Sequence, residues 1–268
     1  MSDAKAQLDA GNLVGAVEAA LNTVRGNPTD GGARTFLFEL SCFSGDWDRA
    51  EKQLEVIGHQ DIAAMIGAKI YQQNFKAERD RGKLFSDGLK PEFLMPVPSY
   101  VEDLLAANNR IREGSIFEAR GLFDAVEENR PASACIVNGE EYSDFRDYND
   151  GTMCVFEVIL KDSYVWLPFE QVQKIEFTEP KTMRDLFWIQ GTVEMVNGTG
   201  GDMFFPALYA NSWKADDDLV RLGRKTDWRD LGEETYAGEG TKAYWMDGKD
   251  KSILDLRNVV FDHERGNG

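Results

Sequence analysis

The segment GNLVGA at residues 11–16 returns 34 residues later as GDWDRA at residues 45–50. In both copies a glycine precedes Asn or Asp, and an alanine closes the segment. A glycine at this place ends one helix because it adopts positive φ without strain, and the Asn or Asp side chain caps the next helix. Apolar residues follow a helical spacing around each copy, and Pro28 closes the first unit. The repeated segment therefore predicts the turn between two antiparallel helices.

The period of the repetition indicates the kind of unit. Thirty-four residues is the length of the tetratricopeptide repeat (TPR), a helix pair that stacks on its neighbours. A third segment with the same spacing, GSIFEA, lies at residues 114–119, offset by 69 residues from Gly45. Since this offset is close to two periods, it predicts a distorted unit in between. Stacked helix pairs form curved surfaces that hold a peptide or helix of another protein, so the repeat favours binding over catalysis.

Further helices are expected up to residue 131. A long helix is predicted over residues 60–85, where Ile62, Ile66 and Ile70 follow a helical spacing. Three prolines within residues 88–98 predict an extended connection, because proline cannot continue a helix. A last helix pair is expected from Ser99 to about residue 112 and over residues 114–129, where Pro131 ends it.

Beyond residue 132 the helical spacing gives way to β-branched and aromatic runs. A hairpin is predicted from residues 153–160 and 164–168, and residues 172–177 alternate as a half-buried strand does. Further strands are predicted over residues 188–196, 203–208 and 253–261.

Short strands, tight turns and many tryptophans are typical of a small barrel or a strongly bent sheet. The predicted fold class is therefore α+β. It consists of an N-terminal TPR-like α-helical repeat domain at residues 1–131 and a small β-rich, barrel-like domain at residues 132–268.

The composition narrows the class of partner. The chain of 268 residues has 47 Asp and Glu against 30 Lys and Arg, a net charge of −17, so its surface repels phosphate backbones and anionic membranes. We therefore expect no nucleic-acid binding and no membrane insertion. A cytoplasmic location is expected, because the start lacks the pattern of a signal peptide and Cys42, Cys135 and Cys154 are spread as buried, reduced thiols are.

Residues that could carry chemistry do not group into a known motif. His59 and His263 are far apart in sequence, and the three cysteines lack the close spacing of a zinc site. Acidic residues cluster at Asp144, Asp147 and Asp150. Residues 147–151 resemble part of a calcium loop but lack its downstream Glu and its flanking helices, so a solvated turn is the preferred interpretation.

An aspartate run and a glycine-rich segment also fail to match a known catalytic or binding motif. Residues 216–218 are a run of three aspartates, and the glycines of residues 198–201 fit no phosphate-binding pattern and predict a turn. We therefore expect no catalytic, cofactor-binding or metal-binding residues and no cofactor, and we classify the chain as a non-enzyme.

Binding residues are sought among the large side chains of the repeat helices. Phe43, Trp47, Tyr71 and Phe75 are the candidate partner-binding residues, in the mode of a helix that lies in a groove. The alternative is that each belongs to the hydrophobic core, and position 47 matches the usual aromatic packing site of the repeat.

Several motifs in sequence order resemble the ImpE/TagJ family. They cover residues 41–54, 144–147, 166–170, 180–188, 205–209 and 221–228, and the likeness extends over about residues 5–262. The resemblance implies a non-enzymatic accessory protein of the bacterial type VI secretion system, with a helical repeat region and a β-rich C-terminal domain. It implies binding to the small subunit of the contractile sheath through that subunit's N-terminal helix, and a link to the ClpV-type ATPase that recycles the sheath.

Two other classes of function stay open at this point. One is a hydrolase within the β-rich half, supported only by acidic and hydroxyl residues. The other is a general acidic chaperone or regulator outside secretion, whose binding would weaken steeply with salt.

Overall fold

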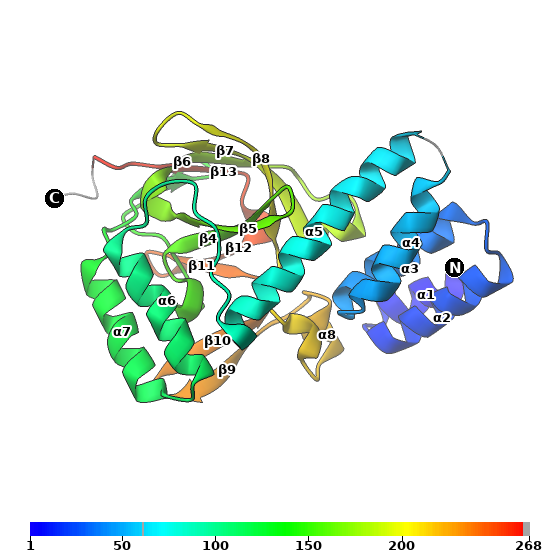
Figure 1. Ribbon diagram of the computed structural model, residues 1–268, viewed down its shortest axis with the longest axis horizontal. Coiled ribbons are helices and arrows are strands. Elements are labelled where there is room, and N and C mark those ends of the chain that lie inside the picture. The colour runs from blue at the N-terminus through cyan, green and yellow to red at the C-terminus, as the bar shows by residue number, and fades with distance from the viewer. Residues whose placement is uncertain (61, 265–268) are drawn as a thin grey trace.

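The computed structural model describes residues 1–60 and 62–264 (Figure 1). Helices occupy the first half of the chain, and one short helix lies between strands in the second half. Their bounds are α1 Ser2–Asp9, α2 Leu13–Gly26, α3 Gly31–Phe43, α4 Trp47–Gly58, α5 Ile62–Asp87, α6 Ser99–Arg112, α7 Ile116–Asn129 and α8 Asp218–Arg221.

The repeated segments form the predicted turns. Gly11, Gly45 and Gly114 have φ of 79°, 69° and 81°, the left-handed conformation that glycine adopts without strain. Asn12 caps α2, since its side chain accepts a hydrogen bond from the backbone N–H of Gly15 at 2.8 Å. Asp46 caps α4 in the same way through the N–H of Arg49 at 3.0 Å. Both capping predictions are confirmed.

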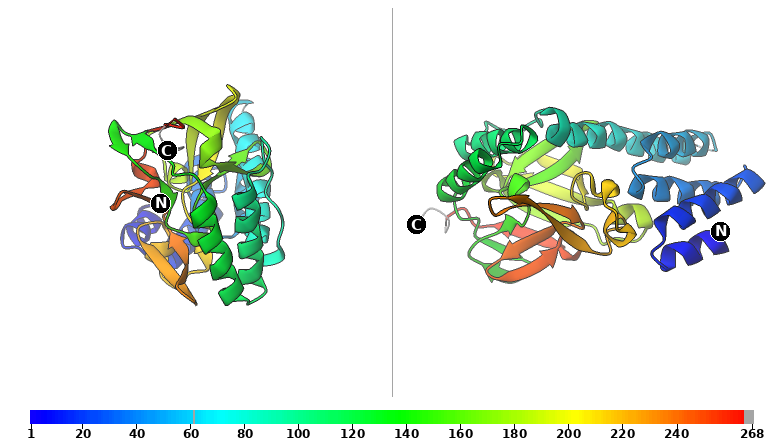
Figure 2. Two further views of the ribbon diagram at one scale, coloured as in Figure 1. Left: turned by 90° about the vertical axis from the view of Figure 1, so that its left-hand side faces the viewer. Right: turned by 90° about the horizontal axis from the view of Figure 1, so that it is seen from below.

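The helix pairs do not form one continuous stack. The hairpins α1–α2 and α3–α4 lie at one end of the molecule, and α6–α7 lies at the other (Figures 1 and 2). Between them runs a single 26-residue helix, α5, and an extended connection precedes α6. The long helix predicted over residues 60–85 is confirmed as α5, and the unit between the second and third copies is distorted as expected, since it holds one long helix and not a helix pair. Residues 62–87 contain no glycine in the left-handed conformation that would divide them into two helices.

The second half contains one large sheet and two small ones. The eight-stranded sheet has the order β2-β1-β13-β6-β7-β8-β4-β5, and its paired neighbours are antiparallel. Its strands are β1 Cys135–Val137, β2 Glu140–Tyr142, β4 Val155–Leu160, β5 Ser163–Pro168, β6 Val172–Phe177, β7 Trp188–Met195, β8 Gly200–Pro206 and β13 Asn258–Phe261. The predicted hairpin is confirmed as β4–β5, with Leu160 opposite Ser163.

The small sheets were not predicted. They pair β9 Thr226–Gly232 with β10 Thr235–Gly240, and join β3 Arg146–Asp147, β11 Ala243–Met246 and β12 Lys249–Ser252. Most of β9 is exposed and three of its seven residues are charged, so it lacks the apolar alternation by which a strand is recognised. The strand predicted over residues 253–261 begins only at Asn258, because Ile253–Asp255 forms a 3₁₀ turn.

One hydrophobic core joins helices and sheet, which confirms the α+β class. Trp166 and Trp188 are fully buried, and the ring of Phe75 on α5 meets that of Trp188 at 5.5 Å. The last helix of the first half ends at Asn129 and the first strand begins at Cys135. The division into two domains at residues 131 and 132 stays a prediction, since side chains from both halves share this core.

The 212–221 segment of the second half covers the turns of the first two hairpins. The ring of Trp213 lies against Gly45, and a Cβ added to Gly11 would lie 2.7 Å from Leu219. The carboxylate of Asp218 accepts a hydrogen bond from the backbone N–H of Leu13 at 2.8 Å, at the start of α2. The two repeat glycines are thus needed for space as well as for backbone conformation. Within residues 1–60 and 62–264, no helix is both long and apolar enough to span a membrane.

Candidate functional site

An apolar hollow of about 520 Å³ lies between α4 and the N-terminal half of α5. We call it the α4–α5 groove. The two helices approach closely because small residues face each other: a Cβ added to Gly58 would lie 3.2 Å from the Cβ of Ala68. The groove is lined mainly by Leu54, Gly58, Met65, Ile66, Ala68 and Ile70, with Glu55, His59 and Lys69 among the polar residues.

The apolar stripe beside this groove has no partner within the described chain. Ile62, Met65 and Ile66 are 74%, 55% and 56% exposed, and Ile70 continues the stripe two turns after Ile62. This end of α5 points away from the sheet (Figure 1). Contiguous exposed apolar side chains on a folded protein mark an interaction site. The groove with its stripe therefore suits the apolar face of a partner helix.

The sequence pattern located this helix but not its exposed face. Between residues 62 and 70 Lys69 is the only charged residue, so the helix start lacks the polar face that a surface helix of a globular protein has. That absence marks an unusually apolar helix start, but it does not distinguish an exposed surface from a buried one.

The four aromatic residues predicted to bind a partner lie together, but they face the interior. Phe43 and Phe75 are buried, whereas Trp47 and Tyr71 are partly exposed and pack against the core. Phe43 meets Phe187 at a ring distance of 5.2 Å, and Tyr71 stacks on Trp188 at 6.1 Å. A partner contact at these positions stays a prediction, and of the four only Trp47 and Tyr71 have surface to offer it.

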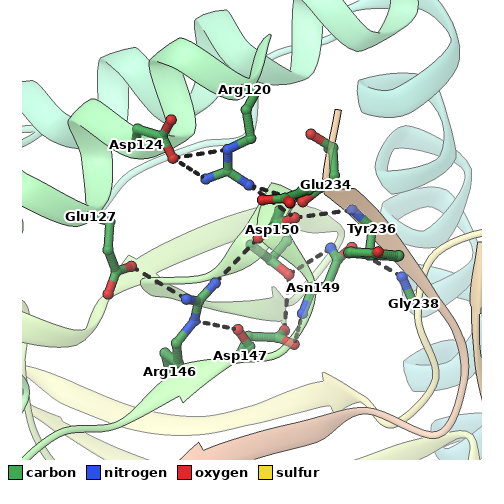
Figure 3. Close-up of polar contacts among 12 residues, drawn as sticks. Arg120, Asp124, Glu127, Arg146, Asp147, Asn149, Asp150, Glu234, Tyr236 and Gly238 are labelled. Atoms are coloured by element: carbon green, nitrogen blue, oxygen red, sulfur yellow. Dashed lines mark hydrogen bonds and ion pairs between the residues drawn. The ribbon is translucent and has the colours of Figure 1, made fainter. Parts of the chain in front are cut away.

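Asp147 and Asp150 of the acidic cluster belong to an internal polar network (Figure 3). Asp147 is fully buried and accepts hydrogen bonds from the hydroxyls of Tyr209 and Thr152 at 2.8 and 2.9 Å. Asp150 accepts from the guanidinium of Arg146 at 3.2 Å, and Figure 3 shows Arg120 on its other side. The interpretation as a solvated turn is therefore wrong.

Burial shifts the pKa values of Asp147 and Asp150, and neighbouring cations oppose the shift. Burial raises the pKa of Asp147, and the ammonium of Lys242 opposes that rise. Burial also raises the pKa of Asp150. In the described part of the chain, no three His, Cys, Asp or Glu side chains are grouped so that they could hold a metal ion.

A second buried network ties α5 to the sheet. Arg81 on α5 donates hydrogen bonds to Glu157 on β4 at 2.8 Å and to Glu78 at 2.7 Å. The ammonium of Lys242 lies 2.5 Å from the other oxygen of Glu157. Burial alone would raise the pKa of Glu157, but Arg81 and Lys242 together bring it far below its ordinary value. This network is a structural joint between the helical half and the sheet.

The histidines and cysteines are placed apart from one another. His59 is exposed at the end of α4, whereas His263 lies 2.8 Å from the carbonyl of Val172 through its Nε2 atom. The three cysteines are buried free thiols, as expected. Burial raises the pKa of the Cys135 and Cys154 thiols to about 12, so these thiols are protonated at neutral pH.

Glu39 lies where α3 meets residues 183–186, and its ionisation makes the stability of the protein depend on pH. Burial raises the pKa of Glu39 to about 7, although the guanidinium of Arg184 lies 3.4 Å away and opposes the rise. Because the folded-state pKa exceeds that of an unfolded glutamate, Glu39 favours the folded state below about pH 4.5 and loses this contribution as pH rises towards about 7.

We therefore expect the free energy of unfolding of the native protein to fall relative to that of Glu39→Gln as pH rises from 5 to 8. Urea unfolding of both proteins at several pH values measures this difference. The free energies of the two proteins would run parallel with pH if Glu39 ionised as an ordinary surface glutamate does.

Comparison with known proteins gives consistent matches. The model of the ImpE protein family matches residues 139–260. A Pseudomonas aeruginosa protein, the type VI secretion system accessory component TagJ, is 30% identical over 255 residues, which covers 95% of this chain and 89% of that protein. The crystal structure of a Vibrio parahaemolyticus protein has the same fold, with a TM-score of 0.88 at 23% identity over 97% of each chain.

Proposed function

The chain belongs to the ImpE/TagJ family, and on that premise we propose that it is an adaptor that captures the N-terminal helix of the small sheath subunit of a type VI secretion system. The Pseudomonas aeruginosa relative TagJ is an accessory component of that system, which supports an accessory role for this chain. A link from the captured sheath subunit to a ClpV-type ATPase is the second part of the proposal.

The observation that carries the proposal is the exposed apolar stripe beside the α4–α5 groove. An amphipathic helix recognises such a groove through apolar side chains spaced by three and four residues. Burying an Ile or Met side chain contributes about 1.5–3 kcal/mol, and the stripe offers Ile62, Met65 and Ile66 together. Polar residues at the edge, Glu55 and Lys69, suit the polar flanks of such a helix.

A binding role also agrees with the state of the polar clusters. Asp147, Asp150 and Glu157 are held by the chain's own arginine, lysine and tyrosine side chains. Catalytic acids and bases need a free face towards a substrate, and these carboxylates are taken up by structural contacts. We therefore favour an adaptor over a hydrolase.

The direct test is binding of the small sheath subunit with and without its first helix. We expect the full subunit to bind and the truncated subunit to lose at least tenfold in affinity, measured by calorimetry. Equal affinity for both forms would contradict helix capture while leaving the accessory role intact.

We expect Ile66→Glu to weaken binding of the full sheath subunit by at least tenfold, about 1.4 kcal/mol. The substitution places a carboxylate in the apolar contact, and the site is 56% exposed, so folding should be little affected. Phe117→Glu is the matched control, because Phe117 is 78% exposed on α7, away from the groove. If both variants bind equally well, the sheath helix docks elsewhere.

A further inference from the structure

A second hollow, of about 450 Å³, lies on the inner side of the first two helix pairs. It is bounded by α1, by α3, by residues 180–186 and 222–224, and by Leu254. We call it the α1–α3 cleft. Its floor is apolar and includes Leu8, Phe36, Met183, Leu186, Leu222 and Leu254. None of its residues lines the α4–α5 groove.

The cleft is what remains open of the inner surface of the repeat. In stacked helix pairs the concave surface is the usual binding face. Here residues 183–187 cover part of that face, since Arg184 pairs with Glu39 at 3.4 Å and Phe187 packs on Phe43 at 5.2 Å. The uncovered part lies beside α1, where Leu8 is partly buried and Lys5 is exposed.

The charge around the cleft is opposite to that of the whole chain. Lys5, Lys181 and Arg224 stand at its edge with one carboxylate, Asp9, in a chain that carries a net charge of −17. Within residues 1–60 and 62–264, none of these three cations pairs with a carboxylate. The guanidinium of Arg224 donates a hydrogen bond to the backbone carbonyl of Asp9, at 3.4 Å. The neighbouring carboxylate of Asp185 accepts hydrogen bonds from the backbone N–H groups of Lys181 and Thr182.

We propose that the α1–α3 cleft binds a short acidic peptide segment of a partner protein, whose carboxylates meet the three cations while one large apolar side chain enters the cleft. The apolar floor supplies burial, and the three cations supply charge complementarity to the carboxylates of an acidic peptide. This site does not depend on helix capture. Since the two hollows share no residue, one chain can hold a helix and an acidic peptide together, as an adaptor between two partners requires.

The probe is a fluorescein-labelled peptide of about ten residues, with Asp and Glu on both sides of a Leu-Phe pair. A second peptide has lysine in place of every acid. With the full chain at low salt, anisotropy should show saturable binding of the acidic peptide alone. Raising the salt to about 0.5 M should weaken this binding several-fold, since the cations are exposed.

Two variants with equal charge change test the location. Lys181→Glu with Arg224→Glu should weaken binding of the acidic peptide at least tenfold. Lys52→Glu with Lys90→Glu, at two exposed lysines outside the cleft, should weaken it by much less. Leu186→Ser, at a 38% exposed position on the floor, should also weaken it and separates docking from long-range attraction.

Several outcomes would overturn the proposal. These are equal binding of the basic peptide, equal affinity in the two double variants, or full affinity in Leu186→Ser. Melting curves of all variants establish that each is folded. Self-association that blocks the peptide, seen as a mass that rises with concentration and falls in Lys181→Glu with Arg224→Glu, would assign the cleft to a second copy of the chain instead.

Discussion

Gly45→Ala is expected to lower the free energy of unfolding by about 2–5 kcal/mol, measured by urea or guanidinium denaturation. Gly45 has a φ of 69°, and a residue with a Cβ loses about 1–2 kcal/mol in that conformation. The added Cβ would also overlap the ring of Trp213, which lies directly against Gly45. Overpacking of this kind costs about 1–3 kcal/mol more.

Gly114→Ala separates the two contributions. Gly114 occupies the same place in the third copy of the repeat, with a φ of 81°. In the part of the chain that the structure describes, no atom beyond Gly114 and its two chain neighbours lies within 4 Å of the position its Cβ would take. Its substitution should therefore cost only the backbone part, about 1–2 kcal/mol. In a Trp213→Ala background, Gly45→Ala should likewise cost only the backbone part, because the ring that its Cβ overlaps is gone. Equal losses in the two glycine variants would mean that the 212–221 segment does not rest on the second hairpin turn.

This pair of glycines shows what the repeat could and could not predict. The glycine, the cap and the following alanine are local features, so the turns at Gly11 and Gly45 and the helices around them follow from neighbouring residues alone. That Trp213 and Leu219 would cover those turns depends on contacts between residues far apart in sequence. No spacing within either segment indicates such a contact.

The same limit explains the strands and the candidate site. β4 and β5 were predictable because buried β-branched and aromatic residues fill them, whereas β9 carries exposed charges and is held by its pairing with β10. The α4–α5 groove is made of ordinary core residue types, and only their exposure distinguishes Ile62 and Ile66 from a buried stripe. Exposure depends on what packs against the helix, which the spacing of one helix does not contain.

The arrangement also supports the proposal that a partner helix docks in the α4–α5 groove and not on the inner face of the repeat. The inner face is partly covered by residues 183–187 and the hairpin turns by the 212–221 segment. The N-terminal end of α5 projects away from the sheet and from these two covering segments (Figure 1). The C-terminal half of the chain therefore leaves the outer end of α5 open for a partner helix.

Arg81→Met is expected to lower the free energy of unfolding by about 3–5 kcal/mol, because it leaves buried carboxylates without their partner. Arg81 is 2% exposed and bonds Glu157, Glu78 and the backbone carbonyl of Leu208. Methionine fills a similar length without replacing any of these bonds. Arg79→Met, two residues away, is the control: its pairs with Glu51 and Asp48 are at the surface, so it should lose about 0–1 kcal/mol.

The pH dependence of the Arg81→Met variant gives a second, independent measurement. In the native chain Arg81 and Lys242 hold the pKa of Glu157 far below its ordinary value, so its stabilising contribution is present above the unfolded-state pKa and disappears only in strong acid. Without Arg81 the effect of burial on the pKa of Glu157 has less opposition, and proton uptake relieves the poorly paired charge of Glu157. The stability difference between native and variant proteins should therefore shrink as pH falls from 7 towards 4. A difference that is small at neutral pH, or that stays constant with pH, would show that the joint between α5 and the sheet depends on apolar packing and not on this ion network.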